Sequence, residues 1–209
     1  MPEVLEAIFE EPMPPETITR PRPAPSPPPV KLTLEQTIKI ANGRPFELVN
    51  GRIEYKIPDN KHSEAQARLS AKLVAYFDHN PIGRVRTEYT LRFWPERPHE
   101  GRVPDLCVIL NENLKDERYG STAPDLAIEI VSRDDGWADL FEKAELYFEK
   151  GSRLVWFVDP MQKGVMVVTP QDRKWVKEIL TCPEFLPDFA LNVIEIFEWP
   201  TKPQKVDAQ

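Results

Sequence analysis

Two short apolar stretches decide the fold of this chain: Val103–Leu110 (VPDLCVIL) and Asp125–Ser132 (DLAIEIVS). Both are rich in aliphatic and β-branched residues, which is typical of strands in the interior of a sheet. Each stretch also carries an acid, Asp105 at the start of the first strand and Glu129 in the middle of the second. An ionised carboxylate in such a place is costly without a cation. We therefore expect both acids to share one.

The polar segment between the two stretches can act as a loop that lets the strands lie side by side. Asp105 and Glu129 would then meet, which is the minimal geometry for a divalent metal. Taken singly, each acid has a simpler interpretation. Asp105 could be a solvated residue at the start of a strand, and Glu129 could lie on a solvated face of an alternating strand.

The chain has 209 residues, of which 41% are hydrophobic, and this suits one globular domain with tails. Residues 1–30 are predicted to be a flexible tail, because Pro21–Pro29 reads PRPAPSPPP. A single globular domain is expected over 31–200. We expect residues 201–209 to be frayed.

Hydrophobic periodicity and turn residues give the order of elements. Helices are expected near 33–42, 62–79 and 137–150, and strands near 46–49, 53–57, 84–93, 103–110, 126–131, 154–158, 165–169 and 175–180, with a last short element at 193–197. Asn50-Gly51 predicts a type I′ turn between the first two strands. This order predicts an α/β fold with a mixed central sheet flanked by helices.

The net charge of −7 gives no overall electrostatic reason to bind nucleic acid. One local basic region is formed by Arg84, Arg86, Arg92, Arg97 and Arg102. These arginines could grip a phosphate backbone near Asp105, or they could be solvated side chains between neighbouring glutamates.

The two cysteines, Cys107 and Cys182, form no disulfide framework or zinc cluster, so we expect a reducing cytoplasm. No stretch approaches the roughly 18 apolar residues of a membrane span, and no export signal is expected.

Lys143 is a third candidate for the site of Asp105 and Glu129. It lies at the margin of the apolar stripe of its helix, so its ammonium group could reach a carboxylate. The alternative is a solvated lysine on the helix flank.

His62, Glu64 and Glu88 are further candidates for the site. His62 and Glu64 could orient water or a metal, or they could cap the helix that they begin. Glu88 could be a metal ligand, although pairing with Arg86 or Arg92 is the favoured interpretation. Asp134-Asp135 is predicted to cap the following helix.

An ordered series of short motifs resembles a known family. The series is Phe46-Glu47-Leu48-Val49-Asn50-Gly51, His62, Val103-Pro104-Asp105, Ala123–Ser132, Lys143, Tyr147 and Val155-Trp156-Phe157-Val158-Asp159-Pro160. It resembles the Uma-two-type family of endonucleases, in the PD-(D/E)XK restriction-endonuclease-like superfamily. The resemblance implies a restriction-endonuclease-like sheet, here with an added N-terminal helix and hairpins. It also implies Mg²⁺-dependent phosphodiester cleavage, with Asp105, Glu129 and Lys143 as the acidic pair and the lysine.

One departure from the superfamily concerns the lysine. Val131 stands two residues after Glu129, where the superfamily pattern has lysine, and the family places its lysine on the next helix, where Lys143 stands. If Lys143 did not reach the acids, the chain would be a nuclease fold without turnover. Asp105, one oxygen of Glu129 and the Ile130 carbonyl are the expected ligands of Mg²⁺, or of Mn²⁺.

The expected function is therefore that of a cytoplasmic, Mg²⁺-dependent endonuclease that hydrolyses DNA. An RNA substrate, and one metal or two, stay open at this stage. The alternative is a catalytically silent module of the same fold that forms oligomers or binds a partner protein. The expected assembly is a homodimer.

Overall fold

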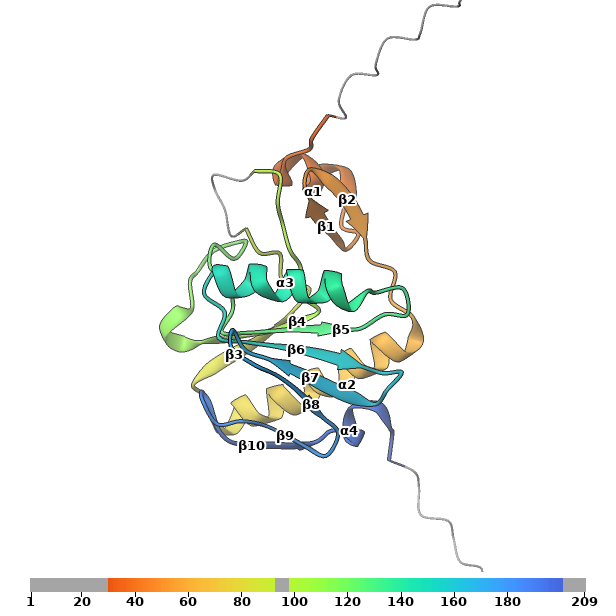
Figure 1. The fold of residues 1–209 in the computed structure, drawn as a ribbon. Coiled ribbons are helices and arrows are strands. Elements are labelled where there is room, and N and C mark those ends of the chain that lie inside the picture. Colours follow the sequence, from red (N-terminus) through yellow and green to blue (C-terminus); the bar gives the residue numbers. More distant parts are fainter. Residues whose placement is uncertain (1–29, 93–97, 201–209) are drawn as a thin grey trace, which may run out of the picture.

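The computed structural model describes residues 30–92 and 98–200 of the chain. Its centre is a six-stranded mixed sheet with the order β3-β4-β5-β6-β7-β8 (Figure 1). The strands are β3 (Gly83–Thr87), β4 (Leu106–Leu110), β5 (Leu126–Ile130), β6 (Leu154–Asp159), β7 (Gly164–Val168) and β8 (Arg173–Val176). β5 and β6 are parallel, and the other neighbouring pairs are antiparallel. The predicted α/β fold with a mixed sheet flanked by helices is confirmed.

Helices cover both faces of this sheet (Figure 1). α3 (Trp137–Glu149) lies on one face, and α2 (Asn60–His79) lies on the other, together with β9 (Ile179–Cys182), β10 (Leu186–Asn192) and the short α4 (Ile194–Phe197). Side chains of a strand alternate between the two faces. In β5, Leu126, Ile128 and Ile130 therefore join the core beside α2, whereas Ala127 joins the core beside α3.

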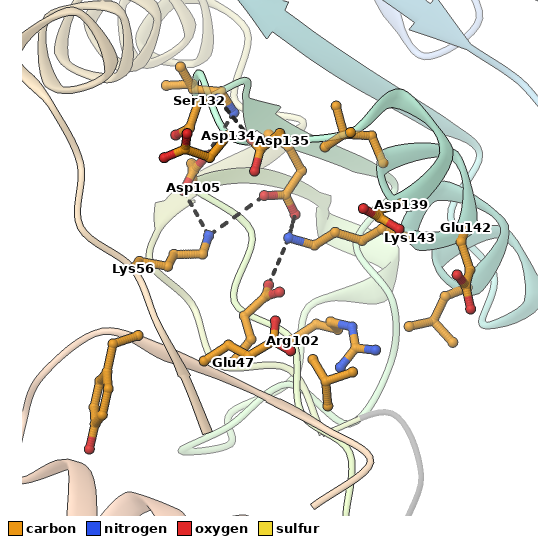
Figure 2. Close-up of a pocket in the computed structure, with 18 of the residues that line it drawn as sticks. Glu47, Lys56, Arg102, Asp105, Ser132, Asp134, Asp135, Asp139, Glu142 and Lys143 are labelled. Atoms are coloured by element: carbon orange, nitrogen blue, oxygen red, sulfur yellow. Dashed lines mark hydrogen bonds and ion pairs between the residues drawn. The ribbon is translucent and has the colours of Figure 1, made fainter. Parts of the chain in front are cut away.

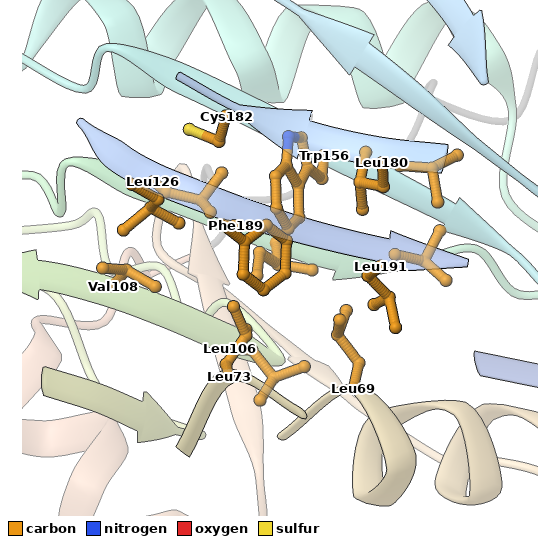
Figure 3. Close-up of a cluster of buried hydrophobic side chains, with 14 of the residues drawn as sticks. Leu69, Leu73, Leu106, Val108, Leu126, Trp156, Leu180, Cys182, Phe189 and Leu191 are labelled. Carbon is orange, nitrogen blue, oxygen red and sulfur yellow. The ribbon is translucent and has the colours of Figure 1, made fainter. Parts of the chain in front are cut away.

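The larger core fills the space between α2, the sheet and the β9–β10 hairpin (Figure 3). Leu69 and Leu73 of α2 meet Leu106 of β4 there, and all three are fully buried. The Trp156 ring stacks on Phe189 of β10 with 6.0 Å between ring centroids. Apolar burial on both faces holds the sheet, and the acids on β5 and beside β4 are carried by this rigid frame.

A small N-terminal unit stands beyond α3, on the side away from the sheet (Figure 1). It consists of α1 (Leu34–Ala41), β1 (Phe46–Val49) and β2 (Arg52–Tyr55). Thr33 and Gln36 form the capping box of α1, and Asn50 and Gly51 have φ values of 51° and 80°, as the predicted type I′ turn requires. The added N-terminal helix and hairpin are confirmed.

Several predicted boundaries are wrong. The strand expected over 84–93 ends at Thr87, because Glu88 adopts a left-handed φ of 49° and turns the chain. The strand expected over 175–180 spans parts of β8 and β9. β10 was missed, since Pro187 within it is typical of a strand break. The predicted tail, apart from Val30, and residues 201–209 lie outside the described residues.

The helix cap predicted at Asp134-Asp135 is also wrong. Gly136 is the N-cap of α3 and makes no side-chain hydrogen bond, while Asp135 accepts a hydrogen bond from the Ser132 N–H. Within residues 30–92 and 98–200, no helix has the length and apolarity needed to cross a membrane.

Candidate active site

Asp105 and Glu129 meet at one end of the β4–β5 pair. Asp105 directly precedes β4 and is 2% exposed, while Glu129 lies in β5 and is 4% exposed. The antiparallel register pairs Leu106 with Ile128, so the residue before β4 lies beside the end of β5. The Ile130 N–H accordingly donates a hydrogen bond of 2.7 Å to Asp105 Oδ2. Ile130 therefore adjoins Asp105, and its predicted role as a carbonyl ligand stays a prediction.

Lys143 reaches this site from α3 (Figure 2). Its Nζ lies 2.9 Å from Glu129 Oε1 and 2.8 Å from Glu47 Oε1 of β1. Tyr147, one helical turn further along α3, donates a hydrogen bond of 2.7 Å from its hydroxyl to the same Glu129 oxygen. The structure thus brings together Asp105, Glu129 and Lys143, the three residues predicted to be catalytic.

Lys56 is a second lysine at the site, and it was not predicted from the sequence. It directly follows β2, and its Nζ lies 2.8 Å from Asp105 Oδ1 and 3.6 Å from Glu129 Oε2 (Figure 2). The same ammonium donates a hydrogen bond of 2.6 Å to the Val103 carbonyl. No local pattern marks Lys56, because a lysine that directly follows a hairpin strand is ordinarily a solvated surface residue. The sequence contains one indirect signal for a second lysine. Two buried carboxylates, Asp105 and Glu129, are predicted with only one lysine, Lys143, to neutralise them.

Glu47, for which the sequence predicts no role, also belongs to the site. It completes the polar cluster by accepting from Lys143 and, through Oε1, from the Val103 N–H at 3.2 Å. Since Glu47 belongs to β1 and Lys143 to α3, this contact ties the N-terminal unit to the main domain.

His62 lies in the first turn of α2 with its ring turned towards the site. His62 Nε2 is 3.5 Å from Asp105 Oδ1, and the side chain is 9% exposed. The capping alternative for His62 is wrong, because Asp59 is the N-cap and accepts a hydrogen bond from the His62 N–H. Glu64 is exposed on α2.

Glu88 does not form the expected pair with an arginine. Gln66 of α2 donates hydrogen bonds of 2.9 Å to Glu88 Oε1 and to the Asp105 carbonyl. Arg86 instead lies over the Tyr89 ring, and Arg92 pairs with the exposed Glu35. Glu88 thus connects to the site through Gln66.

The two acids of the site have opposite pKa shifts. Burial raises the pKa of Asp105, but Lys56 and His62 more than offset this and hold the pKa well below its usual range. Burial raises the pKa of Glu129 above its ordinary value, even though Lys143 and Lys56 act to lower it. Asp105 is therefore the more firmly ionised member of the pair.

Both lysines stay protonated. Burial would lower the pKa of Lys56 and of Lys143, but Glu129 and the neighbouring carboxylates raise it above the ordinary value in both cases. Burial likewise raises the pKa of the Tyr147 hydroxyl well above its usual range, and Glu129 raises it further. All three groups can donate hydrogen bonds, and the two lysines also carry positive charge, but none of them is suited to accept a proton at neutral pH.

The site opens into a cavity of about 1030 Å³. Besides the residues above, its lining includes acidic side chains of α3 and of the loop before it: Asp134, Asp135, Asp139, Glu142, Glu145 and Glu149. Arg102 also lines the cavity, but its guanidinium is bound to Glu100 and to the Leu48 carbonyl. Arg97, another member of the predicted basic region, lies outside the described residues. The cavity wall is therefore acidic rather than basic, which favours the alternative of solvated arginines over a phosphate grip.

The carboxylate oxygens fit a hard divalent cation. Asp105 Oδ2 is held by the Ile130 N–H, and Glu129 Oε1 is held by Tyr147 and Lys143. The other oxygen of each acid faces the Lys56 ammonium, a monovalent cation bridging the pair. Among the described residues, no group of three or more His, Cys, Asp and Glu side chains is arranged to hold a metal. Two carboxylates suit Mg²⁺, which keeps several of its waters and takes substrate oxygens.

Comparisons with known proteins agree with this architecture. A crystal structure from Anabaena variabilis, described as a "putative nuclease belonging to DUF820", superposes with a TM-score of 0.67 and 24% sequence identity. The match covers 79% of this chain and 97% of that one, and it supports the fold. No curated protein matches. The model of the Uma2 family, described as "Putative restriction endonuclease", matches residues 32–193. The chain therefore belongs to the Uma2 family.

Proposed function

We propose that the protein is a Mg²⁺-dependent endonuclease that hydrolyses phosphodiester bonds in DNA. The observation that carries the proposal is the convergence of Asp105, Glu129 and Lys143 in the lining of one cavity. They come from three separate parts of the chain: the residue before β4, the strand β5 and the helix α3. Membership of the Uma2 family, described as "Putative restriction endonuclease", supports the proposed nuclease activity. A cytoplasmic location and a homodimer belong to the proposal as well.

Each residue has a distinct part in the proposed reaction. Asp105 and Glu129 would hold the cation through the oxygens that now face Lys56. The chemistry that Mg²⁺ supplies when bound is a lowered pKa for a coordinated water and partial neutralisation of the phosphate charge. Because Lys143 stays protonated, it acts as a fixed positive charge that stabilises the pentavalent phosphate, and not as a base. Tyr147 positions Glu129.

The experiment compares cleavage of supercoiled plasmid by wild type, Asp105→Asn and Lys143→Met, with Lys61→Met as a control. Lys61 is an exposed lysine at the start of α2, so it matches the change in charge outside the cluster. Asp105→Asn should remove both Mn²⁺ binding and cleavage. Lys143→Met should keep Mn²⁺ binding but lower the cleavage rate by about 100-fold or more, the usual cost of losing one charge-stabilising donor.

Stability must be measured beside activity, because Lys143 is only 16% exposed and neutralises two carboxylates. Its loss should lower the free energy of unfolding by about 3 kcal/mol, so cleavage is assayed where all variants are folded. A structured RNA in place of the plasmid tests the substrate. Equal cleavage rates for wild type and Lys143→Met would contradict the role of Lys143 in the reaction. No cleavage by folded wild type with Mg²⁺ or Mn²⁺ would favour the silent binding module.

A further inference from the structure

Lys56 occupies the space that a cation shared by Asp105 and Glu129 would take. Its Nζ contacts Asp105 Oδ1 at 2.8 Å and Glu129 Oε2 at 3.6 Å, and no other charged hydrogen-bond donor reaches Glu129 Oε2 in the described part of the chain. Asp105 Oδ1 also faces His62 Nε2, at 3.5 Å. The Lys56 ammonium therefore contacts Asp105 Oδ1 and Glu129 Oε2. The sheet and α3 supply hydrogen-bond donors to the other oxygen of each acid.

The remaining oxygens are held by groups that cannot move aside without breaking the fold. Asp105 Oδ2 accepts from the backbone of Ile130, and Glu129 Oε1 accepts from Tyr147, which is fully buried. Lys143 bridges Glu129 Oε1 to Glu47 and so contacts the far side of Glu129 from Lys56. The two lysines thus differ in function: Lys143 is a side support of Glu129, and Lys56 lies between the two acids.

Lys56 is also the member of the cluster that can leave most easily. It belongs to the connection between β2 and α2, outside any helix or strand, and its side chain is 20% exposed. The next residue, Ile57, is 90% exposed, so no other part of the described structure covers the chain at that position. The Lys56 side chain has a flexible four-carbon stem and lines the open cavity, so it can swing into that space.

We infer that Lys56 is an internal competitor of the divalent cation, a plug whose ammonium must be displaced before Asp105 and Glu129 can bind metal. The inference rests on the proposed function of that site. A lysine held by two carboxylates lowers the apparent metal affinity, because binding then includes the loss of its ion pairs. The metal-free site is in turn stabilised, since the plug offsets two buried negative charges.

The experiment is a Mn²⁺ titration of the full chain by calorimetry, in wild type, Lys56→Met and Lys61→Met. Lys61→Met removes the same charge five residues along the chain, outside the cluster, and so measures the general effect of lower positive charge. We expect Lys56→Met to lower the Mn²⁺ dissociation constant by about tenfold or more, and Lys61→Met to change it little. In EDTA, Lys56→Met should unfold at a lower temperature than Lys61→Met, and added Mn²⁺ should restore its stability.

If Lys56→Met does not fold, Lys56→Gln keeps a neutral hydrogen-bond donor near Asp105 and is used in its place. Tighter Mn²⁺ binding by the Lys56 variant supports the plug, whether or not wild type binds detectably. Binding by wild type that Asp105→Asn abolishes, with no gain in the Lys56 variant, overturns the plug and leaves the proposed function standing. Absence of Mn²⁺ binding in every variant overturns both.

Discussion

At the residue scale, five ionisable side chains of the site form one network. Glu47, Asp105 and Glu129 supply three negative charges, and Lys56 and Lys143 supply two positive charges. A buried network of this kind is strongly destabilised when one partner is removed, because the others stay buried without compensation. The three acids and two lysines leave a net charge of −1 in the network, and this charge stabilises the protonated form of His62 beside Asp105.

His62 should make stability depend on pH. Burial lowers the pKa of His62, but the hydrogen bond to Asp105 and the charge of Asp105 raise it by more, so the pKa lies above 6.5 in the folded state. Its contribution is fully present below pH 6.5 and is lost as the pH rises through the folded pKa. The free energy of unfolding of wild type, minus that of His62→Gln, should therefore fall as the pH rises.

Urea unfolding at a series of pH values measures this difference. His79→Gln is a suitable control, since His79 lies at the exposed end of the same helix. A difference between wild type and His62→Gln that stays constant from acid to alkaline pH would contradict the prediction.

At the element scale, the β1–β2 hairpin supplies one wall of the site. Glu47 lies in β1, and Lys56 directly follows β2, so the turn between the strands fixes the positions of both. Gly51 in this turn has a φ of 80°, and a Cβ there would lie 2.6 Å from the Lys31 Cβ and 2.8 Å from the Lys31 Cα. The turn needs glycine both for its conformation and for its close approach to the preceding segment.

Gly51→Ala should consequently be more harmful than the same change at Gly43. Gly43 also has a positive φ, of 84°, but a Cβ there meets nothing within 4 Å. Both substitutions carry the left-handed strain of about 1 kcal/mol, and Gly51→Ala adds a clash with backbone. Chemical denaturation of both variants measures the comparison, and equal losses of stability would show that the clash is relieved.

At the scale of the whole molecule, the proline-rich tail is predicted to be separable from the domain. Residues 1–30 contain ten of the 23 prolines, and Val30, the first residue that the structure describes, is 86% exposed. The N-terminal core begins at Leu32 and Leu34. A chain that lacks residues 1–29 should keep its melting temperature and its cleavage rate, while any binding to a partner protein through the tail is lost.

Thermal melts and plasmid cleavage of the shortened chain test this separation. A large drop in melting temperature would mean that the tail packs on the domain, and the predicted boundary near residue 30 would then be wrong.

Local signals in the sequence predict most of the strands, the hairpin turn and the meeting of Asp105 with Glu129, although they do not predict β10 or the end of β3. Apolar β-branched runs predict strands, and Asn50-Gly51 predicts the turn between two of them. Because a loop joins β4 and β5, the two strands lie side by side and bring Asp105 beside Glu129. Lys143 could be placed as well, because helical periodicity locates it on the margin of the stripe that α3 buries.

Which other groups complete the site depends on tertiary packing. Lys56 contacts Asp105 across 49 positions of sequence, and Glu47 reaches Val103 across 56. These contacts exist because the N-terminal unit pairs with the segment that leads into β4, where Leu48 bridges to Gly101, and no periodicity or turn residue encodes that pairing. The choice of lysine that neutralises a buried acid depends on distance in space, since the attraction between charges falls with separation and not with position along the chain.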